Sequence, residues 1–291
     1  MERRKFLAAV GLTAITPFAM QLQNFKKTVD GFSSTEKMPV LFVGHGSPMN
    51  AIEQNEYSAK WKEIGNSLTT KPQAILCVSA HWQTFGTKVT MMEKPKTIHD
   101  FGGFPQSLFD VEYPAPGSPA FAKQAKELIT TTEVRDDFEW GLDHGCWSVL
   151  NPMFPSADIP VFQLSMDYRM TPQQHYDLGK QLYALRSRGV LIMGSGNIVH
   201  NLGMVQWSES AFEWAKEFDE KIKSLIDSGD HNSIIHYENL GAAAKLSIPT
   251  NEHYLPLLYS LALQDAQDCT EYFNDKTTMG SISMRSVKIS S

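Results

Sequence analysis

The sequence predicts an α/β fold, a single domain in which helices flank a central mixed, largely parallel sheet. Four short apolar runs carry this prediction, because runs of four or five residues without polar alternation are typical of strands covered on both faces. They lie at residues 40–43, 74–78, 161–164 and 190–193. Helical patterns separate these runs, and strands that alternate with helices indicate layers of helix around a sheet.

Residues 1–30 are expected to form an export signal and linker outside this domain. They begin with a basic stretch that includes Arg3 and Arg4, and an apolar run over residues 8–20 follows. The arginine pair resembles a twin-arginine signal, which directs the export of folded proteins. We therefore expect a periplasmic or exported protein, with a cytoplasmic one as the alternative, and a folded catalytic domain over residues 38–290.

Capping signals place the helices between the strands. A capping residue followed by proline at Thr171-Pro172 begins a helix that is expected to end at Gly189. The same signal at Ser118-Pro119 opens a helix that reaches about residue 130. A further helix is expected over residues 208–227.

Composition excludes several classes of protein. A chain of 291 residues can bury a sizeable core without disulfides, and its three cysteines form no CxxC pair. A net charge of −6 argues against nucleic acid as a partner, because a phosphate backbone requires a clustered basic face. Beyond the N-terminal segment no run of about 18 apolar residues occurs, so no membrane anchor is expected in the mature form.

Three of the predicted strands are each followed by a histidine. His45 follows the first run, His81 the second and His200 the fourth, each in a loop that contains Gly or Ser. Ligands of open α/β sheets bind beyond the carboxyl ends of the strands, so the three side chains are expected at one edge. A lone histidine there is typical of a hydrogen-bonded core residue, whereas three together indicate a site.

Imidazole is the commonest protein ligand of first-row metals, so these histidines predict a metal centre. His253 is expected in the first turn of a helix that faces the same edge. We expect His45, His81 and His253 to bind the metal, with His200 beside them as an acid/base group or a fourth ligand. Two or three histidines leave coordination positions open for substrate and for O2 or water.

A long loop over residues 94–117 is expected to bind ligand, because loops of this length within a compact domain are usually functional. It carries His99 and the aromatic residues Phe101, Phe104 and Tyr113, which would line a pocket for a flat aromatic ligand.

The remaining histidines and a neighbouring cysteine carry weaker signals. His144 lies in a turn that leads into a helix, and Cys146 beside it could line the site. Three further histidines have no supporting context and are expected at the surface: His175, His231 and His236.

Six stretches of the body are long and unusual enough to indicate a family. They are LFVGHGSPMN, VSAHWQT, TIHDFGGFPQSLFDVEYPAPGSP, GLDHGCWSVL, GSGNIVHNL and NEHYLPLLY, in this order along the chain. They resemble the motifs of DOPA-type extradiol ring-cleavage dioxygenases, in the class III superfamily of protocatechuate 4,5-dioxygenase. The resemblance covers about residues 38–290.

The resemblance implies a mononuclear non-haem Fe(II) centre, which can also hold Zn(II), and a small catechol as substrate. O2 would open the catechol ring next to, rather than between, its two hydroxyl groups. His45, His81 and His253 match the family's metal ligands, and His200 matches its acid/base histidine.

Two further residues enter through the resemblance. His144 matches a second histidine near the substrate. The wider superfamily uses a carboxylate as third ligand, which makes Glu252 an alternative to His253.

Two other functions use the same residues. A zinc-dependent hydrolase would attack an ester or amide with metal-bound water and would need no O2. A non-catalytic protein would hold a metal and a small aromatic ligand without turning it over.

Overall fold

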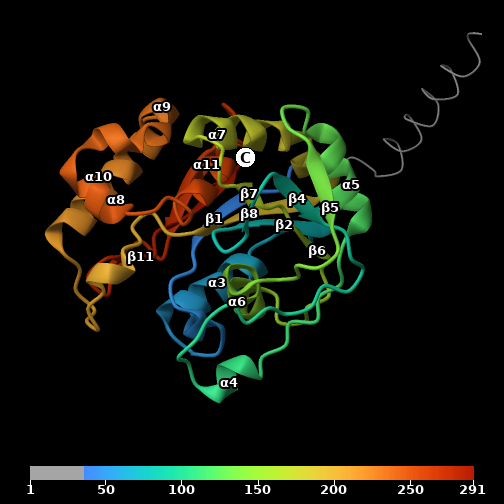
Figure 1. The fold of residues 1–291 in the computed structure, drawn as a ribbon, viewed down its shortest axis with the longest axis horizontal. Coiled ribbons are helices and arrows are strands. Elements are labelled where there is room, and N and C mark those ends of the chain that lie inside the picture. The colour runs from blue at the N-terminus through green and yellow to red at the C-terminus, as the bar shows by residue number, and fades with distance from the viewer. Residues whose placement is uncertain (1–35) are drawn as a thin grey trace, which may run out of the picture. The chain divides into compact units, whose positions relative to one another are not determined.

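The computed structural model describes residues 36–291, and the predicted export signal lies outside them. A six-stranded sheet of order β6-β2-β8-β1-β12-β9 forms the centre of the domain (Figure 1). Its strands are β1 (Val40–Gly44), β2 (Ala74–Ser79), β6 (Val161–Gln163), β8 (Val190–Gly196), β9 (Cys269–Phe273) and β12 (Ser286–Ser290). All four predicted apolar runs are therefore strands of one sheet, and the predicted single α/β domain is confirmed.

The strand directions bring three loops to one edge. β2 pairs in parallel with β6 and β8, and β8 pairs in parallel with β1. Gly44 lies opposite Gly196, and Ser79 lies opposite Ser195, so β1, β2 and β8 end at the same level. β12 is antiparallel to β1 and to β9, which makes the sheet mixed.

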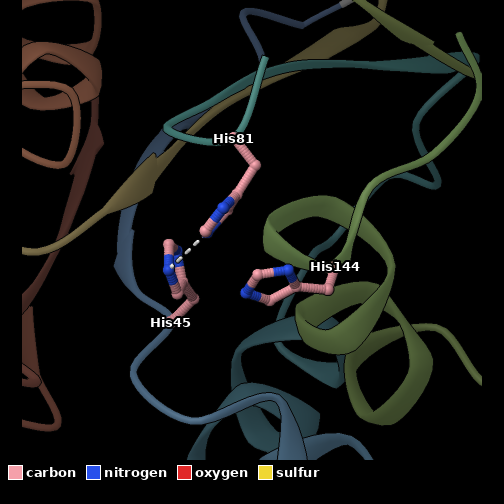
Figure 2. A group of neighbouring side chains, drawn as sticks. All are labelled: His45, His81 and His144. Carbon is pink, nitrogen blue, oxygen red and sulfur yellow. Dashed lines mark hydrogen bonds between the residues drawn. The ribbon is translucent and has the colours of Figure 1, made fainter. Parts of the chain in front are cut away.

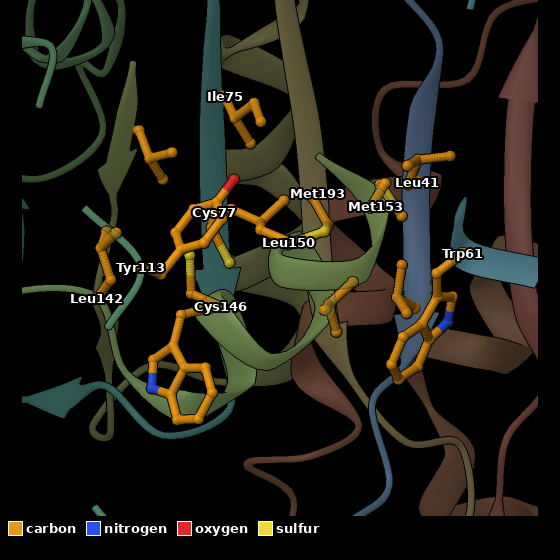
Figure 3. Close-up of a cluster of buried hydrophobic side chains, with 14 of the residues drawn as sticks. Leu41, Trp61, Ile75, Cys77, Tyr113, Leu142, Cys146, Leu150, Met153 and Met193 are labelled. Atoms are coloured by element: carbon orange, nitrogen blue, oxygen red, sulfur yellow. The ribbon is translucent and has the colours of Figure 1, made fainter. Parts of the chain in front are cut away.

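Helices cover both faces of the sheet, as the unbroken apolar runs require. α3 (Glu56–Asn66) and α6 (His144–Met153) lie on one face, and α7 (Pro172–Gln181) and α11 (Leu255–Leu261) lie on the other (Figure 1). Alternate residues of β1, β2 and β8 enter the core beneath α3 and α6 (Figure 3). Its labelled members are Leu41, Trp61, Ile75, Cys77, Tyr113, Leu142, Cys146, Leu150, Met153 and Met193.

Shorter elements complete the domain. The remaining α-helices are α4 (Gln106–Phe109), α5 (Pro119–Leu128), α8 (Glu213–Asp227), α9 (His231–Ile235) and α10 (Ala242–Ser247). The short strands are β3 (Gln83–Thr84), β4 (Thr87–Thr90), β5 (Val134–Asp137), β7 (Met166–Asp167), β10 (Thr277–Thr278) and β11 (Ile282–Ser283). The 3-10 helices are η1 (Pro48–Ala51), η2 (Tyr183–Arg188), η3 (Leu202–Met204) and η4 (Tyr237–Leu240).

Two predicted helices differ from the structure at their ends. The helix that begins after Thr171 stops at Gln181 and continues as the 3-10 turn η2 up to Gly189, whose φ of 75° is a conformation that glycine adopts readily. The helix expected from residue 208 begins only at Glu213. Within residues 36–291, no helix combines the length and the hydropathy needed to cross a bilayer.

Candidate metal centre

Three of the predicted metal-binding histidines lie close together at the carboxyl edge of the sheet. The ring centres of His45 and His81 are 5.0 Å apart, those of His45 and His253 are 5.3 Å apart, and those of His81 and His253 are 5.1 Å apart. Three imidazoles that bind one tetrahedral ion through nitrogen atoms at about 2.1 Å have ring centres roughly 5 Å apart. The three spacings therefore match those of a shared ion.

Close backbone packing fixes the positions of the three rings. His45 directly follows β1, and His81 lies two residues beyond the end of β2. His253 is held against the end of β8, where its carbonyl oxygen accepts a hydrogen bond from the Asn197 N–H at 2.8 Å. A Cβ on Gly196 would lie 2.1 Å from that oxygen, so only glycine permits this approach.

The protonated nitrogen of His45 follows from its hydrogen bonds. The Ser195 hydroxyl donates to the carbonyl oxygen of Gly145 at 2.5 Å, which uses its only hydrogen. Ser195 Oγ lies 3.0 Å from His45 Nδ1 and must therefore accept from it. The proton is on Nδ1, so the lone pair of Nε2 is free for a metal.

The same reasoning applies to the other two rings, because a carboxylate can only accept. His81 Nδ1 lies 3.5 Å from an oxygen of Asp100, and His253 Nδ1 lies 3.1 Å from Glu252 Oε1. His253 Nδ1 is within hydrogen-bond distance of its carboxylate and His81 Nδ1 is within ion-pair distance of its own, so both acceptors favour a proton on Nδ1 and a lone pair on Nε2. Glu252 lies on the Nδ1 side of His253, and its Oε1 also accepts from Thr250 Oγ1 at 2.9 Å.

These residues fit a bound cation. The Nε2 atoms of His45 and His81 point toward each other at 3.2 Å (Figure 2). The contact is a hydrogen bond when one ring carries its proton on Nε2, and two lone pairs face each other when both protons are on Nδ1. Two nitrogens bound to one ion at about 2.1 Å lie roughly 3.0–3.4 Å apart, so a cation between them would replace the repulsion by two bonds.

Burial keeps the imidazoles neutral at physiological pH. Burial, together with the neighbouring histidines, holds the pKa values of His45 and His253 well below their ordinary value. Burial also lowers the pKa of His81 to about 3 and that of His200 to about 4. Neutral imidazole is the form that binds a metal, so the ligands need lose no proton at pH 7.

Two further histidines, His144 and His200, pack against rings of the first three. The ring of His144 packs 3.8 Å from that of His81, and His200 stacks on His253 with ring centres 3.4 Å apart. These spacings are shorter than the roughly 5 Å expected for two ligands of one tetrahedral ion. Within residues 36–291, no hydrogen bond anchors the ring nitrogens of His200, which distinguishes it from the three anchored rings.

The nitrogen and oxygen atoms that could bind a metal form two groups, and neither group contains all of His45, His81 and His253. One nitrogen each from His45, His81 and His144 lie within 4.8 Å of one another (Figure 2). Donor atoms of His200, Glu252 and His253 form a second such group. The two groups adjoin, because the ring of His253 lies beside those of His45 and His81.

Hydrogen bonds hold the start of helix α6 against the sheet beside the site. Asp143 caps the helix and is fully buried, and it accepts from Ser79 Oγ at 2.6 Å and from Gln163 Nε2 at 2.7 Å. Burial raises the pKa of Asp143. A Cβ on Gly145 would lie 2.4 Å from Ser79 Oγ, so the sequence Asp-His-Gly lets the helix begin directly against β2.

Several residues named from the sequence lie elsewhere. His99 Nε2 faces the carbonyl oxygen of Val111 at 3.0 Å, and its ring packs against Trp147. Tyr113 does not line a pocket, since it is buried and its hydroxyl donates to the Phe154 carbonyl oxygen. Cys146 is buried in the core and does not line the site.

The prediction that three histidines lie at the surface holds only in part. His236 is exposed and His231 is partly buried beside Tyr176. His175 is fully buried, and its Nδ1 lies 2.9 Å from the Tyr259 hydroxyl. It occupies the inner face of α7, which the helical spacing from Leu178 would have indicated.

Sequence reasoning missed Asp100 and Ser195, which contact the histidines at Nδ1. Both stand in segments that the sequence marks as functional, the long loop and the glycine-rich loop after β8. Neither segment shows in its sequence which side chain turns toward a histidine.

The fold and this histidine cluster fit a metal-dependent enzyme of the α/β class. Residues 39–285 match the model of the catalytic LigB subunit of aromatic ring-opening dioxygenase, and the chain belongs to this family of extradiol dioxygenases. The family assignment favours the ring-opening reaction over the hydrolase and the non-catalytic binding protein.

Relatives with specific names support the assignment. The chain is 48% identical over 267 residues to a protein of Escherichia coli K12 named 4,5-DOPA dioxygenase extradiol, with 89% of this chain and 97% of the relative covered. A Beta vulgaris protein of the same name is 36% identical over 257 residues, with 86% and 96% covered. A crystal structure of an uncharacterized E. coli K12 protein superposes with a TM-score of 0.76 at 43% identity, covering 87% of this chain and all of that one.

Proposed function

We propose that this dioxygenase uses Fe(II) held by His45, His81 and His253 to open the ring of a DOPA-like catechol with O2. The observation that carries the proposal is the spacing of the three imidazoles, whose ring centres lie 5.0, 5.3 and 5.1 Å apart, with Nδ1 of each ring beside an oxygen. Imidazole nitrogen suits Fe(II) and equally Zn(II), so zinc would occupy the same position. Three protein ligands would leave positions open for both reactants.

When bound, the metal supplies Lewis acidity and the electron transfer between catechol and O2. His200 is the residue that we assign to proton transfer. Its ring nitrogens have no hydrogen-bond partner among the described residues, and burial lowers its pKa to about 4, so at neutral pH the ring is uncharged and keeps a nitrogen lone pair. His200 as a fourth ligand is the alternative, and metal content in a His200 variant separates the two.

His144 and Phe101 would hold the catechol ring. Phe101 is half-buried, and its ring meets that of His144 edge-on with centres 5.5 Å apart. Aromatic rings favour such edge-to-face packing, and a flat substrate ring beside His144 would extend it. His144 Nδ1 lies 3.0 Å from Asp100 Oδ1, which leaves Nε2 as the nitrogen available to substrate.

We propose that the amino acid side chain of the catechol reaches a cavity of about 610 Å³ beside Glu252, although none of the five clustered histidines lines this cavity. Glu252 and Glu238 line it together with Lys245, so charges of both signs border the same space. The ammonium and carboxylate groups of DOPA match this mixture. Relatives named 4,5-DOPA dioxygenase extradiol point to the same substrate.

Anaerobic reconstitution with Fe(II) tests the proposal. The metal-loaded protein should consume O2 and form a yellow product with DOPA, and should do neither with the catechol omitted. Zinc-loaded protein is the matched control, because zinc undergoes no redox change. Turnover of an ester under strict anaerobiosis, with no O2 uptake on any catechol, would support the hydrolase instead.

We also propose that residues 1–30 direct export by the twin-arginine route. The basic start, the arginine pair and the short apolar run support this proposal. Fusing these residues to a reporter that is active only after export should give signal, and changing Arg3 and Arg4 to Lys should abolish it. Equal signal from both fusions would contradict the proposal.

A further inference from the structure

Asp100 connects the long loop between β4 and α4 to two histidines of the site. Its Oδ1 lies 3.0 Å from His144 Nδ1 and accepts from the His144 backbone N–H at 2.9 Å. Its Oδ2 lies 3.5 Å from His81 Nδ1. The side chain is only 18% exposed, so these contacts are shielded from solvent.

We propose that Asp100 is a positioning residue that fixes the tautomer and orientation of His81 and His144 with one carboxylate. The inference deepens the proposed function, because it takes His81 as a metal ligand and His144 as a substrate-facing group. Asp100 lies 3.0 Å from His144 Nδ1 and 3.5 Å from His81 Nδ1, and a carboxylate beside an imidazole nitrogen favours the tautomer that carries its proton on that nitrogen. Each ring then turns an unprotonated Nε2 toward the site.

The loop therefore contributes to metal binding although none of its residues is a proposed ligand. The residue after Asp100 is Phe101, whose ring packs on His144. The position of this one segment therefore affects the proposed ligand His81, the neighbouring His144 and the aromatic ring of Phe101 at the same time. The other two proposed ligands have separate anchors, Ser195 for His45 and Glu252 for His253.

Asparagine is the informative replacement because it keeps the shape and changes the donor pattern. Its amide oxygen can still accept from the His144 backbone N–H and so preserve the start of α6. Its NH2 group would then face His81 Nδ1, which could accept only by moving its proton to Nε2. That tautomer has no lone pair on the nitrogen that points at His45.

The test combines zinc affinity with the tautomer of the metal-free protein. Zinc dissociation constants are measured by competition with a chromogenic chelator, and two-bond ¹H–¹⁵N spectra of histidine-labelled apoprotein report which nitrogen carries the proton. D100N should weaken zinc binding about 10- to 100-fold and move the His81 proton from Nδ1 to Nε2. D110N is the matched control, since Asp110 is an exposed acid of the same segment, residues 94–117, and it should change neither quantity.

Two additional variants secure the result. D100N in an H144A background should still lose zinc affinity, because the effect acts through His81. D100E keeps two acceptor oxygens and should recover part of the affinity, including in the case where D100N folds poorly. Folded D100N with wild-type affinity and an Nδ1–H tautomer at His81 would overturn the proposal, and so would folded D100E that binds zinc as weakly as D100N. Both readouts work without turnover, so absent dioxygenase activity alone would count against the proposed function and leave this inference standing.

Discussion

Replacing His253 and Glu252 separately decides which of these neighbours binds the metal. In the structure His253 Nδ1 contacts Glu252 Oε1 at 3.1 Å, so the free Nε2 of His253 is on the opposite side of the ring from the carboxylate. H253A deletes a proposed ligand, whereas E252Q keeps the size of the anchoring side chain and removes its charge. The two variants should therefore lose very different amounts of metal affinity.

The size of each loss follows from the geometry. Zinc bound by four protein ligands gains roughly 10–16 kcal/mol, so one ligand accounts for about 3–4 kcal/mol, or a factor of order 10² to 10³ in the dissociation constant. Loss of a residue that anchors a ligand typically costs about 10- to 100-fold. The amide oxygen introduced by E252Q could still accept from His253 Nδ1, so this variant should fall at the lower end of that range.

Competition with a chromogenic chelator measures both constants, and metal content after dialysis checks them. H253A should retain little metal, and E252Q should retain most of it. H236A is a suitable control, because His236 is an exposed histidine whose Nδ1 faces the Asn232 carbonyl oxygen. If E252Q lost its metal while H253A bound zinc with wild-type affinity, the carboxylate would be the ligand and the argument from Nδ1 anchoring would be wrong.

Three further predictions concern single side chains. H200A should keep its metal while kcat falls about 10²-fold or more, because we assign His200 to proton transfer and not to metal binding. Loss of metal in H200A would instead show that His200 is a ligand. K245A should raise KM about two- to fivefold for DOPA and leave KM for 4-methylcatechol unchanged, as expected for an exposed ion pair to the substrate carboxylate, and equal changes for both substrates would exclude this contact. Burial lowers the pKa of His175 to about 4. As pH falls below 6.5, His175 therefore becomes protonated in the unfolded chain but stays neutral in the folded protein. Between pH 7 and pH 5 this should remove about 2 kcal/mol of stability, and urea unfolding of metal-free H175Q should show a correspondingly smaller loss, whereas equal losses would contradict the assignment.

The strands and their common edge could be predicted because buried parallel strands leave an unmistakable pattern. The four apolar runs have no polar alternation, and each forms a strand of the central sheet. β9 and β12 were missed because their residues mix polar and apolar types, as in Cys269–Phe273 with its partly exposed face. Both strands are antiparallel to their neighbours, and β9 lies at the edge of the sheet, so neither leaves an unbroken apolar run.

The clustered histidines could also be predicted, because several of them directly follow strands that are parallel and end at the same edge of the sheet. The residues that contact Nδ1 of these histidines could not be predicted. Which oxygen atom lies beside each Nδ1 depends on the three-dimensional fold and leaves no pattern in the sequence. Asp100 is 44 residues from its backbone partner His144. The expectation that Tyr113 lines a ligand pocket fails for a related reason, since its position in the loop gives no sign that the chain turns into the core at that point.

The arrangement of carboxylates explains how five clustered imidazoles can have different roles. Asp100 contacts the proposed ligand His81 and the companion that packs on it, His144. Glu252 contacts the proposed ligand His253, and the ring of His200 stacks on that of His253. Among the described residues, no hydrogen bond joins Glu252 to His200. His144 therefore has a carboxylate beside its Nδ1, whereas His200 has no side-chain hydrogen bond among the described residues. A ring held in one tautomer suits substrate orientation, and a ring without an anchor suits proton transfer, so we expect H144A to act mainly on KM and H200A mainly on kcat. If steady-state kinetics showed the reverse, the presence or absence of an anchor would not determine the role of these two residues.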